Sequence, residues 1–271
     1  KSSMNARSLE RLAMMSRFQF ALENDEFELY FQPKLNLQSK ELQGVEALLR
    51  WHDPTLGVIS PAHFIPLAEE LGLIVQLDLW VIEQAGKHLE QWQALGIKAG
   101  RLAINISACH LSQGKLASSI EAMLTKHKLS GHLLEIELTE SSFISSFTQA
   151  KKELKKVKTL GVNIALDDFG TGFSSLSYLH KFPIDTLKID RSFTANMLND
   201  DTSMRIVNSI IGLAEGLGLE IVAEGIETPE EQEVMQRLEC TYGQGYLFAR
   251  PMPMAELEKW VEAHLAVQSK E

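Results

Sequence analysis

The sequence predicts an α/β fold in which short strands alternate with helices, and a β/α barrel explains the pattern better than a doubly wound sheet. Apolar runs of strand length alternate with helical patterns along most of the chain. The first two of these runs are separated by a gap of hairpin length. The glycine fingerprint Gly-x-Gly-x-x-Gly, which follows the first strand of a dinucleotide-binding sheet, is missing there.

The predicted elements follow one another without a low-complexity linker. Residues 4–23 carry apolar side chains at the three-to-four spacing of a helix. Strand patterns follow at 27–37 and 44–49, and the short gap between them predicts an antiparallel pair. The later strand patterns lie at 102–106, 133–138, 162–166, 184–189 and 219–223. Two of the helices expected between strands have clear starts, at Ser60-Pro61 and at Thr228-Pro229, where Glu231 completes a capping box.

Size and composition limit the class of protein. A chain of 271 residues with 45% hydrophobic residues suits one large domain or two small ones with a sizeable core. No apolar run is long enough to span a membrane, and no charged-then-apolar leader opens the sequence. Because the first residue is Lys1 and not Met, we expect a fragment of a longer protein, with any localisation signals upstream.

Charge and cysteine content argue against two classes of site. The net charge is −10, whereas a protein that holds a nucleic-acid polymer usually carries a basic stripe. The lysines at 151–158 lie in a helical pattern with apolar residues on the other side, which favours a solvated helix face. Cys109 and Cys240 belong to no metal or redox motif, and the histidines lack zinc spacing.

Polar residues follow or end the predicted strands. Asp167-Asp168 comes directly after the run at 162–166 and precedes a glycine-rich turn, although a pair of this kind is by itself more typical of a turn and a helix cap. The same feature recurs along the chain, at Glu46, Asn105, Glu137, Asp167, Asp168, Lys188 and Glu224. Barrel chemistry lies at the carboxyl ends of the strands, and charges within buried strands need partners.

The charge count suggests which partners are needed. Five carboxylates at one mouth would repel one another and take up protons unless cations neutralise them. Two divalent cations and Lys188 supply the opposite charge, and ligands without His or Cys favour Mg²⁺ or Mn²⁺, with Ca²⁺ as a non-catalytic competitor. Two such ions about 3.5–4 Å apart hydrolyse phosphate esters by in-line attack. Asp167 suits the position between them, and Lys188 can orient or deprotonate the water.

At this point the residues resemble the EAL-domain phosphodiesterases. The motif that names the family stands at Glu46-Ala47-Leu48. The other matching stretches, in order and with the family's spacing from about residue 27 to 260, are Gln32-Pro33, Leu49-Arg50-Trp51, Asn105-Ile106-Ser107, Glu137-Leu138-Thr139-Glu140, 167–175, Lys188-Ile189-Asp190, Ala223-Glu224-Gly225 and Gln244-Gly245-Tyr246. The resemblance implies a modified (β/α)₈ TIM-type barrel with an antiparallel first strand. It also implies hydrolysis of cyclic di-GMP, a bacterial second messenger that controls biofilm formation and motility, to linear pGpG.

The resemblance also assigns expected roles. Glu46, Asn105, Glu137, Asp167, Asp168 and Glu224 resemble the ligands of two Mg²⁺ or Mn²⁺ ions. Lys188 resembles the residue that activates water, and Glu140 the glutamate that braces the loop after Asp168. Gln32, Arg50, Asp190 and Gln244 resemble substrate contacts, although Asp190 and Glu227 suit helix capping equally well.

The expected organisation follows from the same resemblance. Residues 1–24 resemble a connector helix, 25–265 an EAL phosphodiesterase barrel and 266–271 a tail. We expect a cytoplasmic bacterial domain, preceded in the full-length protein by a GGDEF or sensor domain and by any membrane anchor. The resemblance also implies a homodimer through the loop after Asp168 and a neighbouring helix. Gly170 and Gly172 make that loop mobile, and a mobile loop is easily coupled to an interface.

Two other functions remain open. A silent cyclic di-GMP receptor would share the barrel, but such receptors typically lack one or more of the acidic ligands, and this sequence has the whole set. A carbohydrate-active barrel would need only two separated carboxylates, and it would not explain Asn105, Lys188 and the Asp pair together.

Overall fold

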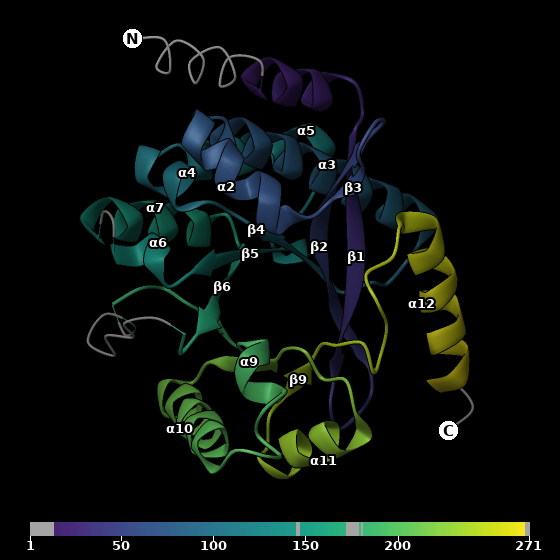
Figure 1. Cartoon of the computed structure of the whole chain (residues 1–271), viewed down its shortest axis with the longest axis vertical. Coiled ribbons are helices and arrows are strands. Elements are labelled where there is room, and N and C mark those ends of the chain that lie inside the picture. Colours follow the sequence, from purple (N-terminus) through teal and green to yellow (C-terminus); the bar gives the residue numbers. More distant parts are fainter. Residues whose placement is uncertain (1–13, 145–146, 172–178, 180, 269–271) are drawn as a thin grey trace.

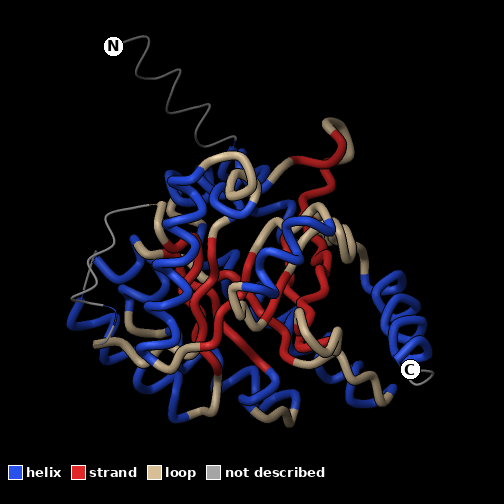
Figure 2. Tube along the Cα trace, turned by 90° about the horizontal axis from the view of Figure 1, so that it is seen from below, coloured by secondary structure: helices blue, strands red, loops and turns tan. Residues whose placement is uncertain are grey.

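A closed barrel forms the centre of the computed structural model, which describes residues 14–144, 147–171, 179 and 181–268. Within these residues the strands follow the order β1-β9-β8-β7-β6-β5-β4-β2-β3, and β1 also pairs with β2. This extra pairing closes the sheet on itself and leaves β3 outside the ring. The predicted β/α barrel is therefore confirmed, and Figure 2 shows its strands enclosed by helices.

The strand bounds agree with the apolar runs. They are β1 (Phe27–Asn36), β2 (Leu42–Asp53), β3 (Gly57–Ile59), β4 (Arg101–Asn105), β5 (Leu134–Thr139), β6 (Asn163–Phe169), β7 (Thr186–Ile189), β8 (Glu220–Ala223) and β9 (Tyr242–Gly243). Strand β1 is antiparallel to both of its neighbours, β2 and β9. The other neighbouring pairs of the ring are parallel, namely β2–β4, β4–β5, β5–β6, β6–β7, β7–β8 and β8–β9. The antiparallel first pair is thus confirmed. The sequence did not predict β3 and β9, because strands of three and two residues show no periodicity.

Helices cover the outside of the barrel (Figure 1). They are α2 (Pro61–Leu71), α3 (Ile74–Leu95), α4 (Ala108–Gln113), α5 (Leu116–His127), α6 (Ser141–Ile144), α7 (Phe147–Thr159), α9 (Arg191–Thr194), α10 (Asp201–Leu217), α11 (Pro229–Arg237) and α12 (Met254–Gln268). The capping box at the start of α11 is confirmed, since Thr228 and Glu231 each accept a hydrogen bond from the other's backbone N–H. On α7 the apolar side is buried and most of the lysines are exposed, as predicted.

A second, smaller core joins the first described helix, at residues 14–23, to the barrel. Phe18 on this helix is fully buried, and its ring centroid lies 5.3 Å from that of Phe27 and 5.6 Å from that of Trp51. Arg17, the residue before Phe18, forms ion pairs with Glu26 and Asp53. Aromatic contacts of this kind stabilise a core beyond the area they bury. The helix is therefore packed against the hairpin β1–β2.

The two ends of the described chain bear on the expected organisation. Residues 14–23 are helical, in agreement with the predicted helix, whose first ten residues lie outside the described part. Helix α12 continues to Gln268, past residue 265, where we placed the end of the barrel. The division into connector, barrel and tail stays a prediction. None of the described helices is long and apolar enough to cross a membrane.

Candidate active site

A buried lysine lies at the centre of the polar side chains that the strands bring together. Lys188 on β7 is fully buried, and its Nζ lies close to carboxylates from four other parts of the barrel. The distances are 2.6 Å to Glu137 Oε2, 2.6 Å to Glu224 Oε1, 3.1 Å to Asp167 Oδ1 and 3.6 Å to Glu46 Oε2. The strand order explains this convergence, because β2, β5, β6, β7 and β8 point their carboxyl ends to one mouth.

The carboxylates outnumber the ammonium group that neutralises them. Burial alone would lower the pKa of Lys188, but the surrounding carboxylates outweigh it and raise the pKa well above its ordinary value. Burial, with the charge of Glu46, raises the pKa of Glu137 well above 4.5. Burial, with Asp167 and Glu46, raises the pKa of Glu224 to about 8. The mouth thus holds more negative charge than Lys188 balances, which favours a bound cation.

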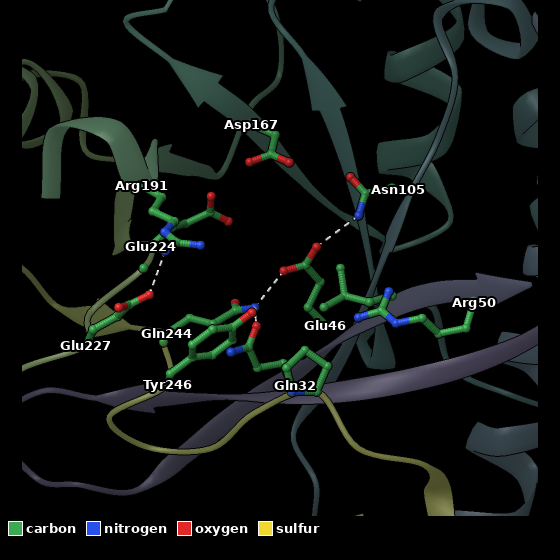
Figure 3. Close-up of a pocket in the computed structure, with 14 residues that line it drawn as sticks. Gln32, Glu46, Arg50, Asn105, Asp167, Arg191, Glu224, Glu227, Gln244 and Tyr246 are labelled. Carbon is green, nitrogen blue, oxygen red and sulfur yellow. Dashed lines mark hydrogen bonds and ion pairs between the residues drawn. The ribbon is translucent and has the colours of Figure 1, made fainter. Parts of the chain in front are cut away.

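Glu46 has the opposite shift because it has more donors. Burial would raise its pKa, but the Lys188 ammonium and hydrogen bonds from Gln244 and Asn105 outweigh burial and lower the pKa. Asn105 Nδ2 donates to Glu46 Oε1 at 2.9 Å, and Gln244 Nε2 donates to Oε2 at 2.6 Å. Gln244 also donates to Gln32 Oε1 at 3.0 Å, so a hydrogen-bonded chain crosses the mouth (Figure 3). These hydrogen bonds favour the ionised form of Glu46 and orient its carboxylate.

A break in strand regularity places both aspartates at the mouth. Neighbouring side chains of a regular strand point to opposite faces. The register of β6 and β7 shifts between Leu166 and Phe169, and Asp168 has a φ of +54°, a left-handed conformation that Asp tolerates better than most residues. As a result, carboxylate oxygens of Asp167, Asp168 and Glu224 lie within 4.8 Å of one another. Burial, with the charge of Asp167, raises the pKa of Asp168 to about 6.

These oxygens fit a divalent cation. The donor set consists of carboxylates with an amide nearby, which is the chemistry that Mg²⁺ and Mn²⁺ prefer. The raised pKa values of Asp168 and Glu224 show that the cluster holds its charge at a cost. A cation would remove that cost, because it offers each carboxylate an opposite charge.

A cleft of about 380 Å³ opens beside the cluster. It is lined by Gln32, Glu46, Leu48, Arg50, Asn105, Asp167, Arg191, Glu224, Gly225, Glu227, Gln244, Gly245, Tyr246 and Pro251. The Arg50 guanidinium lies 5.4 Å from the centroid of the Tyr30 ring. Across the cleft, Arg191 Nη2 lies 2.7 Å from Glu227 Oε1 (Figure 3). The cleft and the acidic cluster therefore form one site.

Sequence reasoning missed Arg191 as a lining residue. It directly follows Lys188-Ile189-Asp190, and its stem lies over Gly225, where a Cβ atom would come within 2.2 Å of Arg191 Cγ. Gly225 has a φ of +68°, which also favours glycine. The available signals were a positive residue just after the end of β7 and a glycine just after the end of the neighbouring strand β8.

Two other expected residues have less direct geometry. Asp190 caps helix α9, where its Oδ1 accepts a hydrogen bond from Ser192 N at 3.0 Å. It is not among the residues that line the cleft. Glu140 follows β5 directly, but residues 172–178 of the loop that it is expected to brace lie outside the described part. The roles of both residues stay predictions.

Comparison with known proteins identifies the family. The model of the EAL domain matches residues 15–251. The chain belongs to the EAL domain family. In this EAL domain, the name-giving Glu46-Ala47-Leu48 lies in β2, and Glu46 contributes to the acidic cluster. The family is metal-dependent, and the buried acidic cluster agrees with that property.

Relatives and solved structures resemble this EAL domain along most of its length. It is 36% identical to the oxygen sensor protein DosP of Escherichia coli over 98% of the chain, and 39% identical to the cyclic di-GMP phosphodiesterase NbdA of Pseudomonas aeruginosa over 95%. It spans about a third of those proteins, 33% of each. The structure of the PaMucR phosphodiesterase in complex with c-di-GMP superposes with a TM-score of 0.86 at 40% identity, covering 90% of this chain and 99% of that one.

Proposed function

We propose that this EAL domain hydrolyses cyclic di-GMP to linear pGpG with two Mg²⁺ or Mn²⁺ ions, by in-line attack of water on the phosphorus. The observation that carries the proposal is the buried Lys188 within a ring of carboxylates that borders a cleft of about 380 Å³. The names of NbdA and of the PaMucR complex support the choice of substrate. Lowering the level of this second messenger would affect biofilm formation and motility.

The residues that would hold the cations are the oxygen donors of the mouth. They are Glu46, Asn105, Glu137, Asp167, Asp168 and Glu224. When bound, the ions polarise the phosphodiester and neutralise the charge that develops on its oxygens. Mg²⁺ and Mn²⁺ support turnover in this proposal, whereas Ca²⁺ competes for the site without supporting it.

The chain's own residues position the reactants. The charged ammonium of Lys188 can donate a hydrogen bond to the oxygen of a water molecule and so orient it beside the acidic cluster. Arg50 can hold a phosphate through the planar fork of its guanidinium. Gln32 and Gln244 can donate hydrogen bonds to the nucleotide, or accept them from it, across the same cleft. Asp190, the N-cap residue of α9, is a further substrate contact in this proposal.

We extend the proposal to the assembly of the protein. The relatives are about three times as long as this chain, which supports a GGDEF or sensor domain in the full-length protein. We propose a homodimer through the loop after Asp168 and its neighbouring helix, with Glu140 bracing that loop. A cytoplasmic location follows from the proposed substrate. Light scattering tests the dimer, and unchanged Mg²⁺-dependent turnover in Glu140→Ala would remove the bracing role.

The decisive experiment is a product assay. The protein is incubated with cyclic di-GMP and Mg²⁺, and the nucleotides are separated by chromatography. Formation of pGpG is expected, with none when Ca²⁺ replaces Mg²⁺ or when Glu46 is changed to Gln. Tight binding of cyclic di-GMP without pGpG in Mg²⁺ or Mn²⁺, by folded dimeric protein, would instead show a receptor module.

A further inference from the structure

A second buried lysine lies inside the barrel, next to Glu137. Lys34 on β1 is only 4% exposed, and its Nζ lies 2.6 Å from Glu135 Oε1 and 3.7 Å from Glu137 Oε1. Glu135 and Glu137 are two residues apart on β5, so their side chains point to the same face of the strand. Both are 1% exposed. The barrel interior therefore alternates negative and positive groups from Glu135 through Lys34 and Glu137 to Lys188.

Glu135 holds Lys34 from the side of the barrel away from the acidic cluster. The other oxygen of this carboxylate, Oε2, accepts from Arg101 Nη1 and from Thr186 Oγ1, both at 3.3 Å. Arg101 is itself paired with Glu220 at 2.9 Å, at the opposite end of the barrel from the cleft. A lysine buried among these groups cannot turn towards water, since it would lose its partner in a region of low dielectric constant.

Glu137 lies between the two lysines. Its Oε2 lies 2.6 Å from Lys188 Nζ, whereas its Oε1 is buried and has no hydrogen-bond partner among the described residues. The charged group near that unpartnered oxygen is Lys34, at 3.7 Å. The two ammonium groups come from β1 and β7, on different sides of the carboxylate. Each oxygen of the Glu137 carboxylate therefore has an ammonium group near it, Lys188 at Oε2 and Lys34 at Oε1.

We propose that Lys34 is a positioning residue that holds Glu137 in the orientation needed to bind a cation. The proposal rests on the proposed function only in taking Glu137 as a metal ligand. Lys188 must share its carboxylates with any cation that enters the mouth. Lys34 keeps its anchor on Glu135, because that contact lies outside the acidic cluster. Partners behind a metal ligand orient it, and their removal typically weakens metal binding about 10- to 100-fold.

The alternative is that Lys34 only neutralises Glu135 and has no effect on the metal site. A double variant separates the two explanations. Lys34→Met leaves Glu135 buried with one fewer partner, which destabilises the protein. Lys34→Met combined with Glu135→Gln removes both charges, and the glutamine can still accept from Arg101 and Thr186. This pair of changes is expected to restore stability, since removal of a complete buried ion pair is often neutral.

The measurements are Mn²⁺ binding to the metal-free protein by calorimetry and unfolding in urea without metal. We expect Mn²⁺ to bind about 10- to 100-fold more weakly to both Lys34 variants, even though the double variant unfolds like the wild type. Arg101→Met is the matched control. It removes another partner of Glu135, whereas Lys34 keeps its contacts with Glu135 and Glu137, so Mn²⁺ binding should stay at the wild-type level.

The outcomes are distinct. A stable double variant that binds Mn²⁺ as tightly as the wild type would overturn the proposal, as would an equal loss of affinity in Arg101→Met. If the single variant does not fold, the double variant decides the question. A wild-type protein that binds no Mn²⁺ also overturns the proposal. A wild-type protein that binds Mn²⁺ but forms no pGpG contradicts only the proposed function, and the role of Lys34 is still decided by the binding data.

Discussion

Glu224→Gln should remove the loss of stability that Glu224 causes in the metal-free protein as the pH rises. Glu224 Oε1 lies 2.6 Å from Lys188 Nζ, and the carboxylates of Asp167 and Glu46 compete for the same ammonium. Burial and these like charges raise the pKa of Glu224 to about 8. A glutamine keeps a carbonyl oxygen that accepts from Lys188, but it adds no negative charge. The variant therefore removes repulsion while the contact with Lys188 remains possible.

The sign of the effect follows from proton binding. The ordinary pKa of a glutamate is 4.5, and that of Glu224 in the folded protein is about 8. Between these values the folded state holds a proton that the unfolded state has lost, so the free energy of unfolding falls as pH rises. At about 1.4 kcal/mol per pKa unit, the upper limit of the loss is about 5 kcal/mol. Because Glu224 shares protons with its neighbours, we expect about 2–3 kcal/mol.

The assay is urea denaturation with a chelator present, at about pH 5.5 and about pH 8.5. Most of the pH range in which Glu224 changes the stability lies between these two values. We expect Glu224→Gln to match the wild type at the lower pH and to be more stable at the higher pH. Glu227→Gln is the matched control, because Glu227 is exposed and paired with Arg191. If Glu224→Gln were destabilised equally at both pH values, the ionised carboxylate would be a favourable partner of Lys188, and the reasoning would be wrong.

Three further predictions concern other parts of the molecule. Lys188→Met should reduce pGpG formation at least about 100-fold and cost about 3–5 kcal/mol of stability without metal, because it leaves buried carboxylates unpaired; product chromatography and urea unfolding measure the two effects. Arg50→Lys should raise the KM for cyclic di-GMP more than it lowers kcat, because an ammonium lacks the planar fork; an unchanged KM would remove Arg50 from the substrate contacts. Phe18→Ala should cost about 3–5 kcal/mol in urea unfolding through loss of packing in the smaller core, and unaltered Mn²⁺ binding is the check that this core is independent of the site.

Local patterns account for the parts of the fold that the sequence predicts. A strand buried on both faces is a continuous apolar run, so the runs at 162–166 and 219–223 correspond to β6 and β8. The start of α11 is equally local, because Thr228 and Glu231 need only each other and their own backbone. The polar residues at the strand ends could also be identified from the sequence, and the resemblance to the EAL family assigned a role to each of them.

Other parts of the site depend on contacts between distant residues. The two-residue strand β9 links β8 to β1 in the barrel, yet its length leaves no period to detect. The sequence shows that Asp167 and Asp168 are adjacent, but only the register shift between β6 and β7 brings both carboxylates to one side. Arg191 enters the cleft because the strand before it ends at the mouth, which the pairing of β7 with β8 decides.

The sequence by itself determined the alternation of strands and helices, the first hairpin and the identity of the acids at the strand ends. Each of these depends on residues within about one strand or one helical turn of each other. The tertiary structure decided that one ammonium group faces four of those acids, and that Lys34 reaches Glu135 across 101 residues of chain and Lys188 reaches Glu137 across 51. Such pairs form only when the barrel closes in one register, because a shift of one residue would turn each side chain to the other face.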